Sequence, residues 1–136
     1  MKNYLIVFFL LALTASVFAQ SKNTAPKQSG PVLTFEKNTH DFGDIFPGDK
    51  VEQVFKFTNT GNEPLIITNI QVTCGCTAPE WPRNPIPPGG KSEIKIAFNS
   101  AGKSGRQNKT VTVVSNAAND ENTISFVANI LDKKPQ

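Results

Sequence analysis

The stretch that decides the fold is residues 55–77, FKFTNTGNEPLIITNIQVTCGCT, which holds two strand-like segments, the turn between them and both cysteines of the chain. Phe55 and Phe57 alternate with polar neighbours, the period of two that a strand with one buried face requires. A Gly-Asn-Glu-Pro turn reverses the chain, and residues 65–73 follow as a run rich in β-branched side chains. The first residues of this run are apolar at both odd and even positions, that is, on both faces of a strand (both parities). We therefore expect the run to be a central strand, covered on both faces.

The same alternation recurs on both sides of this stretch. Residues 77–90 are different, because they hold five prolines, which cannot donate to a strand ladder, so we expect a crossing between sheets or an irregular edge there. No segment offers a helical stripe. The chain therefore predicts an all-β fold, an immunoglobulin-like antiparallel β-sandwich of about seven strands. Besides residues 65–73, strands are expected over residues 32–35 with 40–45 as its continuation, 51–59, 92–98, 107–115 and 123–131.

The parity of these strands also predicts the core. Each strand must turn its apolar side chains toward the facing sheet, so side chains on the apolar parity should share one interior. These are Phe55, Phe57, Ile96, Phe98, Val111 and Phe126.

The first part of the chain is typical of an export signal. A length of 136 residues suffices for one domain. Residues 1–19 carry Lys2, an apolar segment and small side chains before Gln20, which predicts a cleaved signal peptide rather than a retained membrane anchor. The apolar segment is shorter than the roughly 20 residues that span a bilayer. We therefore expect an exported protein, periplasmic or secreted, with no membrane span after signal cleavage, a flexible spacer over residues 20–31 and the sandwich over residues 32–132.

Charge and motifs exclude several classes of function. The formal net charge is +3, and the basic residues are scattered without interleaved aromatic rings, which argues against a nucleic-acid partner. Serine nucleophile elbows, phosphate-cradling loops and paired-carboxylate signatures are missing from the sequence. We therefore expect neither an enzyme nor a cofactor.

Cys74 and Cys76 form the only candidate constellation for chemistry in the sequence. A disulfide between them would close a ring of three residues and stabilise the fold by roughly 1.6 kcal/mol at most. In a straight strand their Cα atoms would lie about 7 Å apart, and Gly75 would let the backbone bring them closer. A structural role, binding of a soft ion such as Cu(I), and redox reactivity all stay open. Zinc is disfavoured because two sulfurs leave its coordination incomplete and His40 is the only histidine.

Two aromatic side chains complete the candidates. Trp81, within the proline-rich segment, is either a cap over one end of the core or an exposed anchor for a partner. His40 is followed by Asp41, and neighbours on a strand point to opposite faces, so the two cannot form an acid–base pair directly. We expect a structural or surface role for His40.

Several of these residues also carry a resemblance to a known family. Over residues 33–131 the chain resembles the exported bacterial domain catalogued as domain of unknown function 1573, which is similar to the Hydin-like group of immunoglobulin folds. The resemblance implies a fold and an export route, and no activity. It is carried, in this order, by Phe35, His40–Gly43, Gly48, Phe55–Gly61, Pro64–Leu65, Cys74–Thr77, Pro87–Gly90, Ile96–Phe98, Gly105 and Ser115–Asn116.

Taken together, these observations predict a small exported binding module. Its partner would be another protein or an envelope component, bound through an exposed sheet edge or the proline-rich segment. The alternative is a thiol-based copper or redox protein that uses Cys74 and Cys76.

Overall fold

The structure, a computed structural model, describes residues 29–120 and 122–132. The predicted signal peptide and most of the predicted spacer, residues 1–28, lie outside the described residues. In the described part of the chain there is no helix long and apolar enough to cross a membrane. Eight strands are formed there: β1 (Leu33–Phe35), β2 (Thr39–Ile45), β3 (Lys50–Asn59), β4 (Ile67–Val72), β5 (Thr77–Glu80), β6 (Lys91–Asn99), β7 (Gly105–Ser115) and β8 (Thr123–Ile130).

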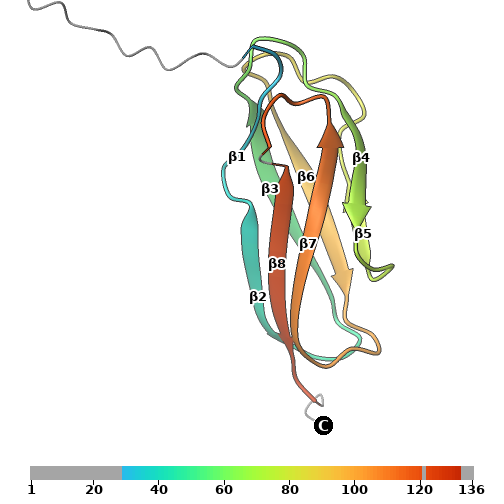
Figure 1. Cartoon of the computed structure of the whole chain (residues 1–136). Coiled ribbons are helices and arrows are strands. Elements are labelled where there is room, and N and C mark those ends of the chain that lie inside the picture. Colours follow the sequence, from blue (N-terminus) through green and yellow to red (C-terminus); the bar gives the residue numbers. More distant parts are fainter. Residues whose placement is uncertain (1–28, 121, 133–136) are drawn as a thin grey trace, which may run out of the picture.

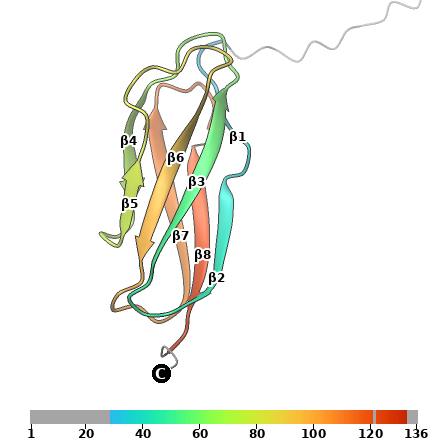
Figure 2. The ribbon, with the colours of Figure 1, turned by 180° about the vertical axis from the view of Figure 1, so that it is seen from behind.

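The strands form two four-stranded sheets that face each other, as Figures 1 and 2 show from opposite sides. The first sheet has the order β1-β3-β6-β5 and the second the order β2-β8-β7-β4. All neighbours are antiparallel except β2 and β8, which run parallel. The predicted β-sandwich is therefore confirmed, with one parallel pair.

The chain changes sheets on both sides of the sandwich. The predicted first strand and its continuation are two strands, because β1 pairs with β3 in one sheet and β2 pairs with β8 in the other. This division makes seven strands of the six expected ranges, and β5, inside the proline-rich segment, is the eighth. On the opposite side β4 belongs to the second sheet and β5 to the first, so the link between them, which holds both cysteines, crosses from sheet to sheet (Figure 1).

The core lies between the sheets where the alternation predicts it. All six predicted core side chains are at most 2% exposed. Phe98 and Phe126, from different sheets, have ring centroids 5.4 Å apart, so aromatic contacts join the two layers. Lys56, which lies between two buried phenylalanines, is exposed. The predicted parity of β3 is thus confirmed.

One buried polar side chain ties the loops at one end of the sandwich. Asn59 is 0% exposed. Its Oδ1 accepts hydrogen bonds from the amides of Val32 (3.2 Å) and Gly61 (3.1 Å), and its Nδ2 donates to the carbonyls of Glu63 (2.7 Å) and Ile86 (2.9 Å). An asparagine amide has two donors, and both are used here, so its burial is compensated.

The position predicted for residues 65–73 is wrong, because β4 is an edge strand and not a central one. The apolar run that suggested a central strand mostly precedes β4. Leu65 forms an isolated bridge with Ile86, and Ile66 is 40% exposed. Residues 77–90 match their expectation better, since β5 is a short edge strand that contains Pro79.

Candidate functional site

Both cysteines lie in the link between β4 and β5. The amide of Thr77 donates to the carbonyl of Cys74 (3.3 Å), which closes a tight turn, and the amide of Asn99 on β6 donates to the carbonyl of Cys76 (2.9 Å). A disulfide joins Cys74 and Cys76, whose Cα atoms are 5.3 Å apart. This distance is shorter than in a straight strand because the chain turns here.

The disulfide does not depend on a glycine at position 75. Gly75 has no positive φ, and a Cβ added there would meet nothing within 4 Å. The backbone freedom that we expected of Gly75 is therefore not what brings the sulfurs together. What Gly75 leaves is open space beside the disulfide.

A hollow of about 290 Å³ lies beside Cys76 on the outer face of the first sheet. Glu52 pairs with Ala97, and Ala97 pairs with Ala78, so two small side chains follow Glu52 in the cross-strand row where the hollow forms. The next row holds Lys50 and Asn99 beside Cys76. The lining consists of Lys50, Glu52, Gly75, Cys76, Ala78, Ala97, Phe98 and Asn99.

The nearest polar side chain to the sulfurs is Thr77. Its hydroxyl lies 3.9 Å from the Sγ of Cys74 and 3.9 Å from the Sγ of Cys76, and the residue is buried at 6% exposure. A sulfur in a disulfide is no thiolate ligand, and within residues 29–120 and 122–132 no group of three His, Cys, Asp or Glu residues could hold a metal ion. His40 belongs to β2, at the opposite edge of the second sheet from β4.

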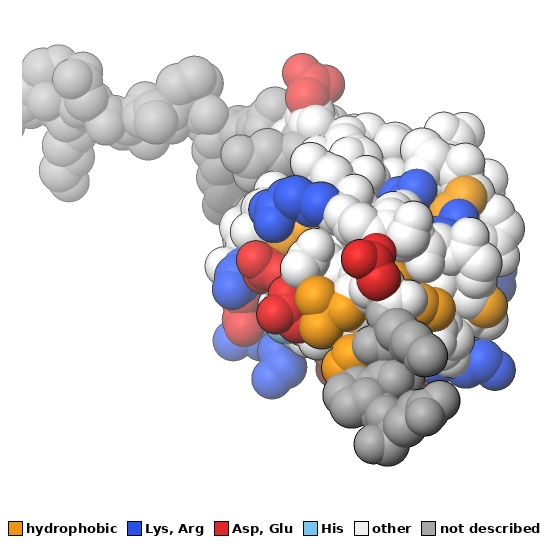
Figure 3. All heavy atoms as spheres, turned by 90° about the horizontal axis from the view of Figure 1, so that it is seen from below, with side chains coloured by type: hydrophobic (Ala, Val, Ile, Leu, Met, Phe, Trp, Pro, Cys, Tyr) orange, Lys and Arg blue, Asp and Glu red, His pale blue; other side chains and the backbone are white. Residues whose placement is uncertain are grey.

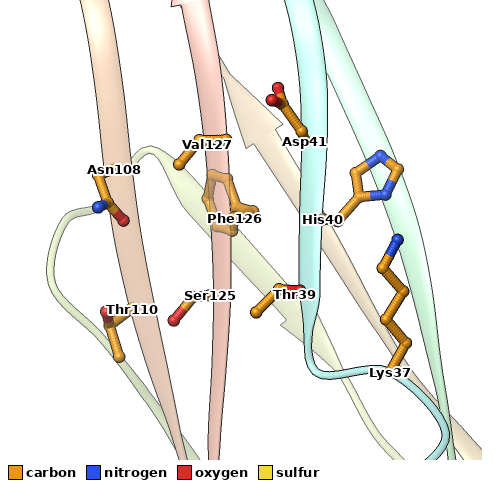
Figure 4. A pocket seen from close by; sticks show the side chains of 9 residues that line it. All are labelled: Lys37, Thr39, His40, Asp41, Asn108, Thr110, Ser125, Phe126 and Val127. Atoms are coloured by element: carbon orange, nitrogen blue, oxygen red, sulfur yellow. The ribbon is translucent and has the colours of Figure 1, made fainter.

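His40 and Asp41 point in different directions from β2, as Figure 4 shows. His40 is half-buried and packs edge-on against Phe42, with ring centroids 4.6 Å apart. Asp41 is exposed and borders a hollow of about 450 Å³ on the second sheet. Its lining combines hydroxyl and amide side chains with three titratable and two apolar ones, and consists of Lys37, Thr39, His40, Asp41, Asn108, Thr110, Ser125, Phe126 and Val127.

Trp81 follows β5 directly and packs against the core cluster, half-buried. The guanidinium of Arg83 lies 3.8 Å from the centroid of its ring, a cation–π contact. Trp81 therefore contacts both the core and Arg83. The indole Nε1 of Trp81 is buried, and no protein group accepts a hydrogen bond from it.

One ion pair lies on the outer face of the first sheet near Trp81. Lys95 Nζ lies 3.2 Å from Glu80 Oε2, joining β5 to β6 across the strands. The hydrogen bond to Glu80, and then the charge of Glu52, raise the pKa of Lys95 above its ordinary value. Both side chains are well exposed, so the pair adds little to stability.

The edge strands of the two sheets differ in how they are protected from pairing with another strand. The outer edge of β1 is closed by a side chain. Asn119 Oδ1 accepts a hydrogen bond from the Leu33 amide (3.0 Å), and Asn119 Nδ2 donates to the Leu33 carbonyl (2.8 Å). The side-chain amide thereby occupies the place that another strand would take on this three-residue edge.

The edge of β2 is interrupted by a bulge. Its register against β8 shifts between Asp41 and Asp44. Gly43 has φ +70°, a conformation that favours glycine, and its amide donates to Asp41 Oδ1 (2.8 Å). A bulge with two exposed carboxylates prevents another strand from pairing along β2.

The edge of β5 lacks hydrogen-bond donors. Because the Asn99 amide donates to Cys76 on the β5 side, alternation turns the backbone groups of Thr77 and Pro79 away from β6. Pro79 has no N–H, and the amide of Thr77 is already bonded to Cys74. An incoming strand would find carbonyls only.

The edge of β4 is open. The amide of Val113 on β7 donates to the Asn122 carbonyl (2.7 Å), which lies on the β8 side. Alternation then turns Thr112 and Val114 toward β4, and the backbone groups of Ile70 and Val72 outward. Among the described strands β4 pairs with β7 alone, so these two amides and two carbonyls form a template for another strand.

An exposed apolar side chain adjoins this edge. Ile66, directly before β4, is 40% exposed. Every other large hydrophobic side chain among the described residues is buried or half-buried. The lower end of the molecule differs, because charged side chains of both signs lie interspersed there with only small hydrophobic areas (Figure 3). Sequence analysis did not find the β4 edge, since alternation describes side chains and the edge consists of backbone groups.

Comparisons with known proteins agree with the fold. A protein of unknown function from Porphyromonas gingivalis W83 superposes with a TM-score of 0.64 at 17% identity, over 76% of this chain and 48% of that one. Secreted serine protease VesC from Vibrio cholerae gives 0.55 at 17% identity, over 76% and 24% of the two chains. The ASH/PapD-like domain 7 of human CEP192 gives 0.54 at 12% identity, over 76% and 87%.

These likenesses show the fold alone, because the identities are low, and the chain spans about half of the P. gingivalis protein and a quarter of VesC. No curated protein matches the chain. The family model "Protein of unknown function (DUF1573)" matches residues 33–130, which confirms the predicted family but not its likeness to the Hydin-like group. With nearly the whole described sandwich covered by that match, the chain belongs to the DUF1573 family.

Proposed function

We propose that this protein is an exported, non-enzymatic binding module that takes up an extended segment of another protein along the edge of β4. The partner would be a protein of the cell envelope, in keeping with the signal-like residues 1–19. The observation that carries the proposal is that β4 is open while the three other edges are capped, bulged or poor in donors.

The chemistry of this edge defines what it can bind. Ile70 and Val72 offer two N–H donors and two carbonyl acceptors, as many as a short added strand uses. Each such bond contributes about 0.5–1.5 kcal/mol net, so affinity needs an apolar contribution as well. Ile66 supplies an exposed apolar contact at the start of the edge. A partner segment should therefore be extended and carry an apolar side chain opposite Ile66.

A pull-down from envelope extract with three forms of the mature protein tests the proposal. Val72→Pro removes one outward N–H from the edge without changing the pairing of β4 with β7. Gln71→Ala is the control, because Gln71 is exposed and its backbone faces Thr112. We expect wild type and Gln71→Ala to recover the same partner and Val72→Pro to lose it.

Two further measurements keep the test decisive. Ile66→Lys changes only an exposed side chain and should weaken capture at least tenfold, even if Val72→Pro folds poorly. In the wild-type complex, the amides of Ile70 and Val72 should become protected from hydrogen exchange. Unchanged capture by Ile66→Lys together with unprotected amides would assign binding to another surface and overturn the β4 proposal, and failure to recover any reproducible partner would count against a binding module.

A further inference from the structure

The Cys74–Cys76 disulfide has no evident purpose as a staple for the fold. It joins residues two apart in sequence, and loops this short gain least from cross-linking. It also lies in the link between strands, where backbone hydrogen bonds already fix the chain through the carbonyls of Cys74 and Cys76. A different use of the two sulfurs therefore has to be considered.

The disulfide is open to attack from one side. Cys76 lines the hollow of about 290 Å³, and its neighbours in the lining include glycine and two alanines, which leave room for an incoming side chain. The space beside Gly75 is empty to at least 4 Å from where a Cβ would stand. An extended segment that carries a cysteine would approach Cys76 through this hollow.

Two charged side chains and one hydroxyl surround the sulfurs. Lys50 and Glu52 both line the hollow beside Cys76, and the cation of Lys50 favours the thiolate form of a nearby sulfur whereas the carboxylate of Glu52 disfavours it. The Thr77 hydroxyl, 3.9 Å from both sulfurs, can turn its hydrogen toward whichever sulfur becomes negative. Neither Lys50 nor Thr77 is needed for a disulfide that stays closed.

From these observations we infer that Cys74–Cys76 is a thiol–disulfide exchange site that accepts two electrons from a dithiol of a partner protein. The first partner thiolate bonds to Cys76 Sγ, and the electron pair of the S–S bond leaves on Cys74 Sγ. The second partner thiolate then attacks the partner sulfur of this mixed disulfide, and Cys76 Sγ leaves with its electron pair.

The exchange balances in electrons and protons. The partner dithiol loses two electrons and two protons and becomes a disulfide, while Cys74 and Cys76 gain both and become two thiols. Cys76 is the sulfur attacked because it borders the hollow. The site is separate from the β4 edge proposed for binding and does not depend on it.

The test uses the oxidised mature protein and two probes, a reduced Cys-Gly-Pro-Cys peptide and glutathione at equal thiol concentration. Exchange is followed at neutral pH by mass spectrometry of acid-quenched samples. We expect one peptide disulfide per protein, at least tenfold faster reaction with the peptide than with glutathione, and glutathione adducts on Cys76 rather than Cys74.

Filling the hollow provides the matched variants. Ala97→Leu and Ala78→Leu add bulk at two places of the lining, on solvent-facing positions, and each should slow exchange about tenfold. Thr110→Leu adds similar bulk to the outer face of the other sheet and should leave the rate unchanged. Native melting curves of each variant verify that it is folded.

Several results would overturn the inference. If both alanine variants react at the wild-type rate, the hollow is not the route to the sulfur. Reaction that occurs only when urea unfolds the domain would make the disulfide purely structural. Equal rates with peptide and glutathione would remove the assignment to a protein dithiol, and adducts on Cys74 would reverse the roles of the two sulfurs.

Discussion

At the scale of single residues, Asn59 shows how one side chain can organise several loops. Its four side-chain hydrogen bonds reach residues on both sides of β3 and as far along the chain as Ile86. The sequence places Asn59 on the apolar parity of β3, where a polar residue looks like an exception. The exception is stable because both donors and the acceptor oxygen are fully used.

Asn59→Ala should therefore lower the free energy of unfolding by about 2–4 kcal/mol. The substitution leaves two backbone amides and two backbone carbonyls around the buried side chain without their hydrogen-bond partners. Urea melts of the purified variant measure this loss. Asn108→Ala is the control, since Asn108 is exposed on β7 and should change stability by no more than about 0.5 kcal/mol. A loss for Asn59→Ala as small as that of the control would mean that water replaces the amide.

At the scale of the element, β3 shows what alternation determines. Phe55 and Phe57 are 2% and 1% exposed, and Phe57 also contacts Phe35 of β1, with ring centroids 6.0 Å apart. Lys56 between them is exposed and pairs with Glu93 across β6. Side chains on the buried face of β3 should therefore contribute more to the free energy of unfolding than those on its exposed face.

We expect Phe57→Ala to destabilise the domain by about 3–5 kcal/mol, the usual cost of removing a buried phenyl ring. Lys56→Ala should cost about 0.5 kcal/mol or less, as surface substitutions do. Both values follow from urea unfolding monitored by circular dichroism. Equal losses would show that β3 is buried on both faces, contrary to its observed burial pattern.

At the scale of the whole molecule, long-range pairing holds the fold together and the disulfide does not. The ladders of β3 with β6 and of β2 with β8 connect segments well separated in sequence, whereas Cys74–Cys76 closes a ring of three residues. Substitution of the two cysteines should therefore abolish the proposed exchange while it changes the stability of the fold little.

Replacing both cysteines, in Cys74→Ser/Cys76→Ser, should lower the free energy of unfolding by roughly 1.6 kcal/mol at most, the entropy limit for so small a ring. Unfolding should stay a single cooperative transition, and capture of a partner at β4 should be unchanged. Chemical denaturation and the pull-down described above measure the two effects. A loss above about 3 kcal/mol would give the disulfide a structural role and leave less reason for exchange.

The sequence by itself determined most of the strands, their buried faces and hence the sandwich, but neither β5 nor the division of β1 from β2. These follow from alternation, which relates each side chain to its neighbours two positions away along the same strand. The family resemblance also came from the sequence, and so did the choice of Cys74, Cys76 and Trp81 as candidates. None of these required knowledge of which strands meet.

Only the tertiary structure decided which strands are edges and which edges are open. Residues 65–73 were expected to form a central strand because the run starts apolar on both parities, yet β4 within them has one neighbour. Whether a backbone N–H is free depends on groups far along the chain, as where Asn119 closes the edge of β1 at Leu33, 86 residues away. The hollow beside Cys76 likewise forms where residues of β3, β5 and β6 meet, and they do so only in the folded sheet. A pattern with a period of two residues carries no information about such distant partners.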